Sequence, residues 1–349
     1  MVRDARPGGL TYRDSGVDDA AVSSALAQVE GALRSTYTPQ VVSAPGAFAG
    51  LFRADFPGYA EPLLAATTDS VGTKARLAVE AGRPGGTGFD IVNHCANDLL
   101  VSGARPLFFL DYFGTAELKP DELAAVIRGV SEASRALGCA VIKGETAQLP
   151  GFYTQGVFDL VGTMVGVVDR PHLLGAHRVR AGDALLGLAS VGLHTNGFSL
   201  ARRALFEVGG RRLSEAPPEL GGETLADALL RPHRAYGPSV LPLLPDEDIH
   251  AMAHITGGGI PGNLMRVLPE GVTATVQRDR WAPPLIFGVI QQAGGIMDDE
   301  MFSTFNLGVG MVVVVAEAAA DRLAAALSNG ETVYRMGAVA EGPRGVDIL

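Results

Sequence analysis

Cysteine is scarce in this chain of 349 residues, which contains only Cys95 and Cys139. The two positions match no metal-ligand spacing, and two thiols form at most one disulfide, which argues against a zinc or disulfide framework. Such usage is typical of proteins from a reducing compartment. We therefore expect a cytoplasmic protein.

Long apolar runs are also missing. The longest uncharged apolar stretch, residues 307–316, is too short to span a bilayer. Residues 1–6 lack the apolar centre of a secretory signal peptide. Charged residues make up 19% of the chain and the mean hydropathy is +0.21, which argues against long disordered tails. We expect no membrane partner.

Positive charge, and lysine in particular, is in short supply. The formal net charge of −10 argues against bulk attraction to nucleic acid, because that binding depends on neutralising phosphates. Arginine supplies all the basic residues except Lys74, Lys119 and Lys143. Where arginine is the usual cation, a lysine can be present because a compact charge is needed. Chance is the alternative explanation for the presence of only three lysines. Lys74 and Lys143 lie in motif-like segments, and Lys119 is expected in a surface turn.

The length and a hydrophobic content of 47% predict a large core and more than one domain. Strand and helix patterns interleave in both halves, which predicts a mixed α/β (α+β) class. A Pro-containing segment and a turn-like segment at 180–183 follow residue 168, so we place two domains at 1–170 and 171–349. Periodicity predicts strands at 63–67, 107–113, 140–142, 160–168, 184–189, 249–255, 272–276 and 309–315, and helices at 18–34, 88–102, 120–137, 223–230, 233–244 and 317–328, with further helices after Asn196 and from Asn263.

The most informative motif is residues 68–74, Thr-Asp-Ser-Val-Gly-Thr-Lys, at the end of the first strand. Asp69 offers the hard oxygen ligand that suits Mg²⁺. Gly72 lets the backbone approach an anion, and Lys74 supplies a point charge. A metal–phosphate site is one interpretation, and an ordinary turn after a strand is the other.

Polar residues recur within the apolar helix at 88–102. Asp90, Asn93 or His94, and Asn97 fall on one face, and Asp98 lies beside them. If that face is buried, these groups need protein partners, a metal or a ligand. A solvated outer face is the alternative.

A second strand-end motif contains Glu145 directly after the strand at 140–142. Ligands in α/β proteins collect at the carboxyl ends of strands, so Asp69 and Glu145 would lie together if their strands are neighbours. Asp111 interrupts an apolar strand, and we expect it to form a structural hydrogen bond.

Two loops in the second half could hold an anion. Residues 192–197 precede a helix whose free amides favour an anion, and His194 could transfer protons near neutral pH. A capping Asn196 with His194 in a turn is the alternative. The glycines at 257–259 could form an anion nest. Residues 257–262 also match a dinucleotide fingerprint weakly, and no Walker A motif is present, which excludes an ordinary P-loop.

These motifs together resemble the phosphoribosylformylglycinamidine cyclo-ligase (aminoimidazole ribonucleotide synthetase) family of purine biosynthesis. The resemblance extends through nearly the whole chain in family order, over residues 12–18, 68–74, 95–99, 106–112, 144–151, 194–197, 254–259 and 304–310. It implies two α/β domains, with the amino-terminal domains of a homodimer paired in a barrel-like interface and ATP bound near it.

The resemblance also implies a reaction. ATP would phosphorylate the formyl amide oxygen of formylglycinamidine ribonucleotide, which turns a poor electrophile into one with a leaving group. A nitrogen of the amidine side would then close the imidazole ring and expel phosphate. Such chemistry needs mainly positioning and charge neutralisation.

The matching positions receive roles by the same resemblance. Mg²⁺ would be bound by Asp69, Asp98 and Glu145. Catalytic roles fall to Asp69, Lys74 and His194, with Lys74 neutralising the transferred phosphoryl group. The implied ATP and phosphate contacts are Gly72, Thr73, Lys74, Gly257, Gly258 and Gly259, and the implied substrate contacts are His194, Thr195 and Asn196.

Two departures and two alternatives accompany this assignment. The family's Gly-Gly-Phe-Gly-like loop is replaced by residues 45–50, and Lys143 stands where the family commonly has a small residue. A related kinase acting on thiamine monophosphate is the nearest enzymatic alternative. A non-catalytic nucleotide-binding scaffold is the other, and the presence of every candidate carboxylate argues against it.

Overall fold

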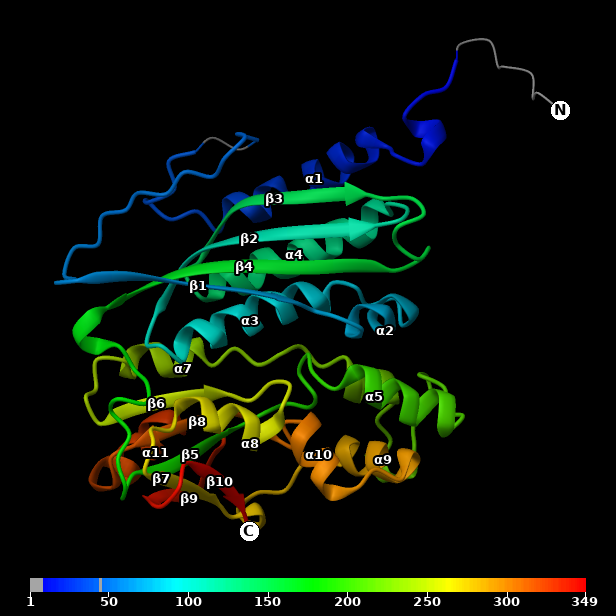
Figure 1. Cartoon of the computed structure of the whole chain (residues 1–349). Helices are drawn as coiled ribbons and strands as arrows, with labels where there is room; N and C mark the ends of the chain where they lie inside the picture. Colours follow the sequence, from blue (N-terminus) through cyan, green and yellow to red (C-terminus); the bar gives the residue numbers. More distant parts are fainter. Residues whose placement is uncertain (1–8, 44–45) are drawn as a thin grey trace.

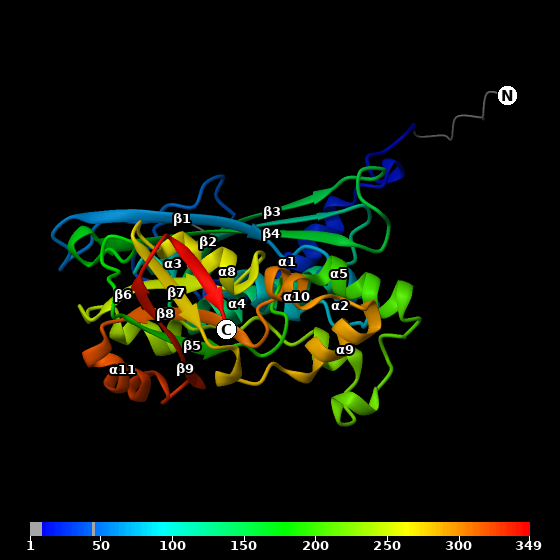
Figure 2. The same ribbon diagram turned by 60° about the horizontal axis from the view of Figure 1, so that its bottom comes forward.

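The computed structural model describes residues 9–43 and 46–349. Those residues contain two β-sheets, one from each half of the chain, with helices packed between and around them (Figures 1 and 2). The predicted mixed α/β class is confirmed. Residues 1–6, for which no signal-peptide core was expected, and Pro45 of the 45–50 loop lie outside the described part. None of the described helices has the length and apolar content to cross a membrane.

The first sheet has the strand order β1-β4-β2-β3. Its strands are β1 (Pro62–Ser70), β2 (Arg105–Thr115), β3 (Ala140–Gln148) and β4 (Phe158–Asp169). Only β2 and β3 pair in parallel. Buried and accessible positions alternate along β2 and β4 because helices cover one face of the sheet. The covering helices are α1 (Asp19–Arg34), α3 (Gly86–Leu100) and α4 (Pro120–Ala136).

The second sheet has the order β10-β7-β9-β5-β8-β6. Its strands are β5 (Ala184–Ala189), β6 (Ile249–His254), β7 (Val272–Val276), β8 (Val309–Val315), β9 (Val333–Glu341) and β10 (Gly345–Ile348). Every residue of β8 is buried, as expected for a central strand covered on both faces. Because β6 and β7 are not neighbours, the loop between them is not part of a Rossmann unit, and the weak dinucleotide reading of residues 257–262 is wrong.

The remaining helices are short. They are α2 (Lys74–Glu80), α5 (Phe198–Arg202) with a π-helical continuation (Arg203–Val208), α6 (Leu225–Leu229), α7 (Gly237–Val240), α8 (Gly259–Leu264), α9 (Leu285–Gly294), α10 (Asp298–Thr304) and α11 (Ala320–Leu327). The observed bounds differ most from the prediction for the helices expected at 233–244 and from Asn263. In the first region α7 covers only four residues, and in the second α8 begins before Asn263. The helices α2, α9 and α10 and the strands β9 and β10 were not predicted.

The polar face of α3 joins the two halves of the molecule. Asn93 donates to the carbonyl of His233 at 2.7 Å, and Asn97 donates to that of Arg234 at 2.8 Å. Asp90 and Asn97 in turn accept backbone N–H groups of this segment, from His233 and Tyr236. The face is therefore buried and satisfied by protein partners, and the alternative of a solvated face is wrong. The segment before α7 is held against the first half by these bonds.

The segment at 170–183 separates the sheets and contains the predicted boundary. The division into 1–170 and 171–349 stays a prediction.

Candidate active site

A groove forms where the end of β1 and the start of α2 meet the loop before α5. Its lining is Asp69, Ser70, Val71, Gly72, Thr73, Thr195, Asn196, Gly197, Phe198, Ser199, Leu200 and Thr304. Five of the predicted site residues are thus brought together from both halves of the chain: Asp69, Gly72, Thr73, Thr195 and Asn196. Gly72 has a φ of 64°, a left-handed conformation that favours glycine at this turn.

The imidazole of His94 joins two of the predicted carboxylates. Its Nε2 lies 2.9 Å from Asp69 Oδ2 and 3.8 Å from Asp98 Oδ2, and its Nδ1 lies 2.6 Å from the hydroxyl of Thr195. Burial opposes the charged form of His94, but the hydrogen bond to Asp69 and the charges of Asp98 and Asp69 raise its pKa. An imidazolium here donates to both sides of the groove.

Both carboxylates are ionised in this setting. Burial opposes the ionisation of Asp69, yet the hydrogen bond and charge of His94 lower its pKa. Burial acts in the same way on Asp98, whose pKa is lowered by a hydrogen bond from His254 and by His94. The Asp69 and Asp98 side chains are 38% and 28% exposed, so each keeps lone pairs for a ligand.

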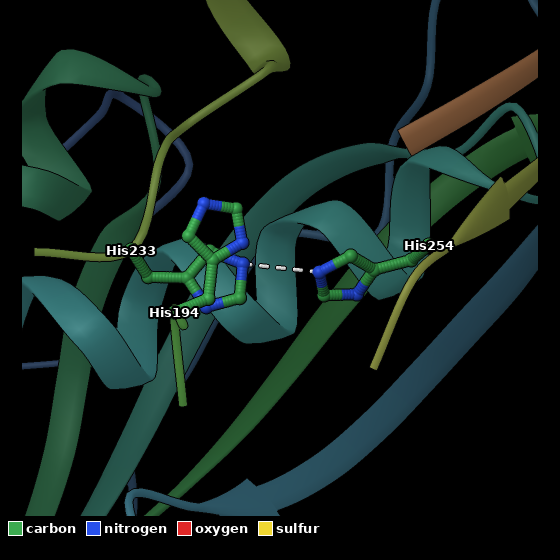
Figure 3. A group of neighbouring side chains, drawn as sticks. All are labelled: His194, His233 and His254. Carbon is green, nitrogen blue, oxygen red and sulfur yellow. Dashed lines mark hydrogen bonds between the residues drawn. The ribbon is translucent and has the colours of Figure 1, made fainter. Parts of the chain in front are cut away.

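A second layer of histidines lies beneath this pair. His254 Nδ1 donates to Asp98 at 2.8 Å, and the Nε2 atoms of His254 and His233 are 3.0 Å apart. His194 stacks on His233 with ring centroids 4.0 Å apart, and the two rings face His254 (Figure 3). Four of the seven histidines of the chain therefore meet at the junction of the two halves.

His194, predicted to transfer protons near neutral pH, lies beneath the groove, and its catalytic role stays a prediction. The residue is buried, with a φ of 61° that is unusual for a non-glycine residue. Burial, together with the nearby charges of His254 and Lys74, lowers its pKa well below the usual range. Its ring is therefore neutral at pH 7. The neighbouring Thr195 and Asn196, in contrast, line the groove, and their contact with the substrate stays a prediction.

Lys74, predicted to neutralise a transferred phosphoryl group, has protein partners for its ammonium in this structure, and its catalytic role stays a prediction. Its side chain is 1% exposed, and its ammonium donates to Asp90 and to the carbonyls of His194 and Arg231 at 2.8–2.9 Å. These contacts use all three ammonium protons. Burial lowers the pKa of Lys74 and raises that of Asp90, and the attraction between them opposes both shifts. Lys74 therefore joins α2 to the second half of the chain.

Glu145 is separated from the other two predicted metal ligands. It lies within β3, at the opposite edge of the first sheet from β1, with β4 and β2 between them. Residues paired across neighbouring strands lie on the same face of a sheet, and successive residues of one strand alternate between the faces. Glu145 pairs with Tyr112, whereas Asp69 pairs with Gly162, which pairs with Asp111. Because residues 111 and 112 are successive, the two carboxylates lie on opposite faces. Within one chain the three-carboxylate metal site is not formed, because the two strands are not neighbours.

The glycine loop at 257–259 and Asp111 were also singled out from the sequence. Gly257 lies close to Asn196, since a Cβ at Gly257 would be 3.5 Å from Asn196 Oδ1, so the glycine loop 257–259 borders the groove. Asn263 ties this loop down by donating to the carbonyls of Gly257 and Gly259. Asp111 is buried next to a cavity between α1 and β3, and burial raises its pKa to about 7. Among the described residues no other residue donates a hydrogen bond to its carboxyl group, so the expected structural hydrogen bond is not formed.

Sequence reasoning missed His233 altogether. Its neighbours in the chain show no motif, and its place follows only from the bonds that its backbone makes to α3. His254 was noticed only as the first residue of the glycine loop.

Two family models match most of the chain. Residues 56–168 match the model described as AIR synthase related protein, N-terminal domain, and residues 180–349 match its C-terminal domain. The phosphoribosylformylglycinamidine cyclo-ligase of Anaeromyxobacter dehalogenans (strain 2CP-1) is 47% identical over 339 residues, covering 96% of this chain and 97% of that protein. The one from Citrifermentans bemidjiense is 44% identical over 341 residues, covering 97% and 98%.

Similar solved structures share the fold. The thiamine-monophosphate kinase of Stenotrophomonas maltophilia K279a has a TM-score of 0.69 and 21% identity, covering 92% of this chain and 95% of that one. The hydrogenase maturation protein HypE in complex with ATP has a TM-score of 0.68 and 20% identity, covering 96% and 93%. Similarity at this level of identity shows the fold alone.

Proposed function

The chain belongs to the phosphoribosylformylglycinamidine cyclo-ligase family, and on that premise we propose that its active site is the groove described above. The observation that carries this proposal is the pair of ionised carboxylates, Asp69 and Asp98, joined by His94 at the edge of an open groove. Both halves of the chain contribute to that groove, as a site that must hold a folded substrate requires.

The enzyme is an ATP-dependent ligase that forms a C–N bond. It closes the imidazole ring of formylglycinamidine ribonucleotide to give aminoimidazole ribonucleotide, ADP and phosphate, in de novo purine biosynthesis. The kinase and scaffold alternatives rest on distant structural similarity only. Holding the flexible substrate in a folded form supplies much of the rate, because ring closure is intramolecular.

The carboxylate pair fits a hard dication. Asp69 and Asp98 are ionised, partly exposed and anchored by His94 and His254, and Mg²⁺ commonly takes one or two carboxylates plus phosphate oxygens. Mg²⁺ bound there would neutralise phosphate charge during transfer. Glu145 of the same chain does not belong to this set.

The remaining groove residues would position the substrates. Thr195 holds the His94 ring through its hydroxyl, which orients the opposite ring nitrogen toward Asp69. Gly72 and Thr73 at the start of α2 would bind phosphate oxygens from one side of the groove. In the glycine loop beside Asn196 the N–H of Gly259 already donates to the carbonyl of Thr256, so Gly257 and Gly258 are the proposed phosphate contacts.

The chain would act as a homodimer. The face of the first sheet that the helices leave open presents partly accessible apolar side chains from β1, β2 and β4: Leu64, Phe108, Leu110, Val161 and Val165. An apolar sheet face of this kind is typical of a subunit interface. Glu145 lies on this face, so pairing would bring it toward the other subunit.

A reducing compartment agrees with the two thiols. Cys95 and Cys139 are free and buried, and burial raises the pKa of each. A cytoplasmic location is proposed on this cysteine usage.

The proposed site is tested by Asp69→Asn, which keeps the shape of the side chain and removes the charge. We expect turnover to fall at least a hundredfold, because the phosphate charge loses its counter-ion support. The measurement is ADP release from ATP and Mg²⁺, with and without formylglycinamidine ribonucleotide, together with the appearance of aminoimidazole product.

The matched control is Asp279→Asn, an exposed aspartate far from the groove in the chain. It should leave turnover unchanged. Near-normal turnover of Asp69→Asn, with circular dichroism equal to wild type, would remove Asp69 from the site. Loss of activity in both variants would point to a general effect of the substitution.

A further inference from the structure

Three buried imidazoles converge beneath the carboxylate pair. His194, His233 and His254 are 1%, 1% and 5% exposed, and each offers a ring nitrogen such that the three atoms all lie within 4.8 Å of one another. They come from three separate segments: the loop before α5, the segment before α7 and the end of β6. We propose that these three imidazoles bind a transition-metal dication of the zinc class, at a site distinct from the carboxylate pair.

An unsatisfied ring nitrogen points to a missing ligand. His194 Nδ1 is buried and has no hydrogen-bond partner, whereas its Nε2 lies 3.4 Å from the amide of Val191. A buried polar atom without a partner is unfavourable and uncommon in folded proteins. The left-handed backbone at His194 keeps the ring in this position. A metal ion would give Nδ1 the partner that the protein does not supply.

The geometry of the other two rings suits the same ion. The Nε2 atoms of His233 and His254 are 3.0 Å apart, and two nitrogens at ordinary zinc–nitrogen distances in a tetrahedral site are about 3.3 Å apart. Their Nδ1 atoms face away, toward Thr195 at 3.3 Å and Asp98 at 2.8 Å. A ligand histidine that donates its second N–H to a carboxylate or hydroxyl is a recurrent feature of zinc sites.

Charge around the cluster also favours a dication. Asp98 contacts His254 directly, and Asp69 is joined to the same group through His94. The ammonium of Lys74, which donates to the His194 carbonyl, is balanced by Asp90.

The ligand type separates this site from the proposed Mg²⁺ site. Imidazole nitrogens suit Zn²⁺, Co²⁺ and Ni²⁺, whereas Mg²⁺ prefers the oxygens of Asp69 and Asp98. Three histidines leave a fourth position, as zinc sites with an open coordination place do. An ion here would fix the His194 loop, which carries the groove residues Thr195 and Asn196.

The test uses the full-length protein, freed of metal with a chelator and titrated with Co²⁺ alone, without ATP or substrate. We expect one tightly bound Co²⁺ per chain with the intense visible absorption of a four-coordinate site, displaced by stoichiometric Zn²⁺. His233→Gln should weaken binding at least tenfold. The control His177→Gln, an exposed histidine outside the cluster, should bind as wild type does.

Three results would overturn the proposal. One is weak absorption typical of six oxygen ligands in the wild-type protein, which needs no variant to interpret. Another is unchanged Co²⁺ binding by a His233→Gln protein whose circular dichroism matches wild type. The third is loss of binding in Asp69→Asn with retention in His233→Gln, which would assign the ion to the carboxylates. Since no substrate is present, each outcome is independent of ring closure.

Discussion

The side chain of Lys74 shows how strongly burial can change the role of one residue. Its ammonium is enclosed with Asp90 between the two halves of the molecule, and both partners have additional hydrogen bonds from or to backbone groups. Removing one partner of such a pair leaves an uncompensated buried charge. This destabilises the folded state more than replacing both partners by apolar residues would. The pair therefore constrains which residues position 74 tolerates.

Lys74→Met is expected to lower the free energy of unfolding by about 3–5 kcal/mol, because Asp90 would remain buried without its counter-ion. Urea unfolding followed by circular dichroism measures this change. The control is Lys119→Met, which breaks an exposed pair with Glu122 and should cost less than about 1 kcal/mol. Equal losses in the two variants would contradict the structural role of Lys74.

Asp111 links stability to pH. Burial raises its pKa from 3.8 to about 7. Between these values the folded protein keeps a proton that the unfolded chain has released, so stability falls as pH rises through this window and levels off above it. This difference in pKa corresponds to a loss of at most about 4 kcal/mol in the free energy of unfolding.

Asp111→Asn should remove this dependence and make the protein more stable than wild type at pH 8. The measurement is the free energy of unfolding in urea at several pH values between 4 and 8. Asp279→Asn, at an exposed position, should keep the wild-type slope. A wild-type curve that rises with pH across this window and is unaffected by Asp111→Asn would show that the carboxyl is ionised in the folded state.

At the scale of elements, the crossing of α3 and α4 depends on two glycines. A Cβ at Gly88 would lie 2.2 Å from the carbonyl oxygen of Val126, and one at Gly129 would lie 2.3 Å from the carbonyl oxygen of Gly85. These contacts are with backbone, which cannot rotate away. The close approach brings α3, with its polar face, to the position from which it binds the 233–236 segment.

Gly88→Ala is expected to push the two helices apart and to lower stability by about 1–3 kcal/mol, the usual cost of overpacking. Differential scanning calorimetry should show a lower Tm. Gly31→Ala is the matched control, because it lies in the exposed part of α1 with nothing within 4 Å of the added methyl group. That variant should be neutral or slightly more stable, since alanine is the better helix former. A Gly88→Ala protein as stable as wild type would refute the close crossing.

At the scale of the whole molecule, the two faces of the first sheet have different tasks. One face packs against α1, α3 and α4, and the other presents apolar side chains that no described segment of the chain fully covers. The groove lies at the junction of the two halves, beside the end of β1.

Leu110→Glu is expected to convert the proposed dimer to a monomer, because it places a charge in the middle of the apolar face of β2. Light scattering after size exclusion should give twice the chain mass of 36.2 kDa for wild type and a single mass for the variant. Leu285→Glu changes an exposed leucine of α9 and should not alter the mass. A wild-type protein that elutes as a monomer would end the dimer proposal.

Much of this molecule was determined by the sequence itself, because local patterns carry that information. Period-two and period-3.6 spacing located β1, β2, β4, β5, β7, β8, α1, α3 and α4 to within a few residues. The motif around Asp69 and the run of family motifs identified the reaction and five residues of the groove. The helix predicted at 233–244 is far too long, since α7 covers four residues, and the strands β9 and β10 were not predicted. Segments as short as α7 and β10 show too little periodicity to be located.

The tertiary structure alone decided which of these residues meet. Strand patterns do not reveal strand order, so only the arrangement β1-β4-β2-β3 shows that Glu145 is remote from Asp69. A lysine in a motif looks like a phosphate contact until its surroundings are known, and Lys74 is enclosed by groups from residues 90, 194 and 231. His233 reaches the cluster through backbone bonds to α3, from 140 residues away. Burial, pKa and the meeting of distant side chains depend on packing between segments, and that packing is not encoded in any local stretch of the chain.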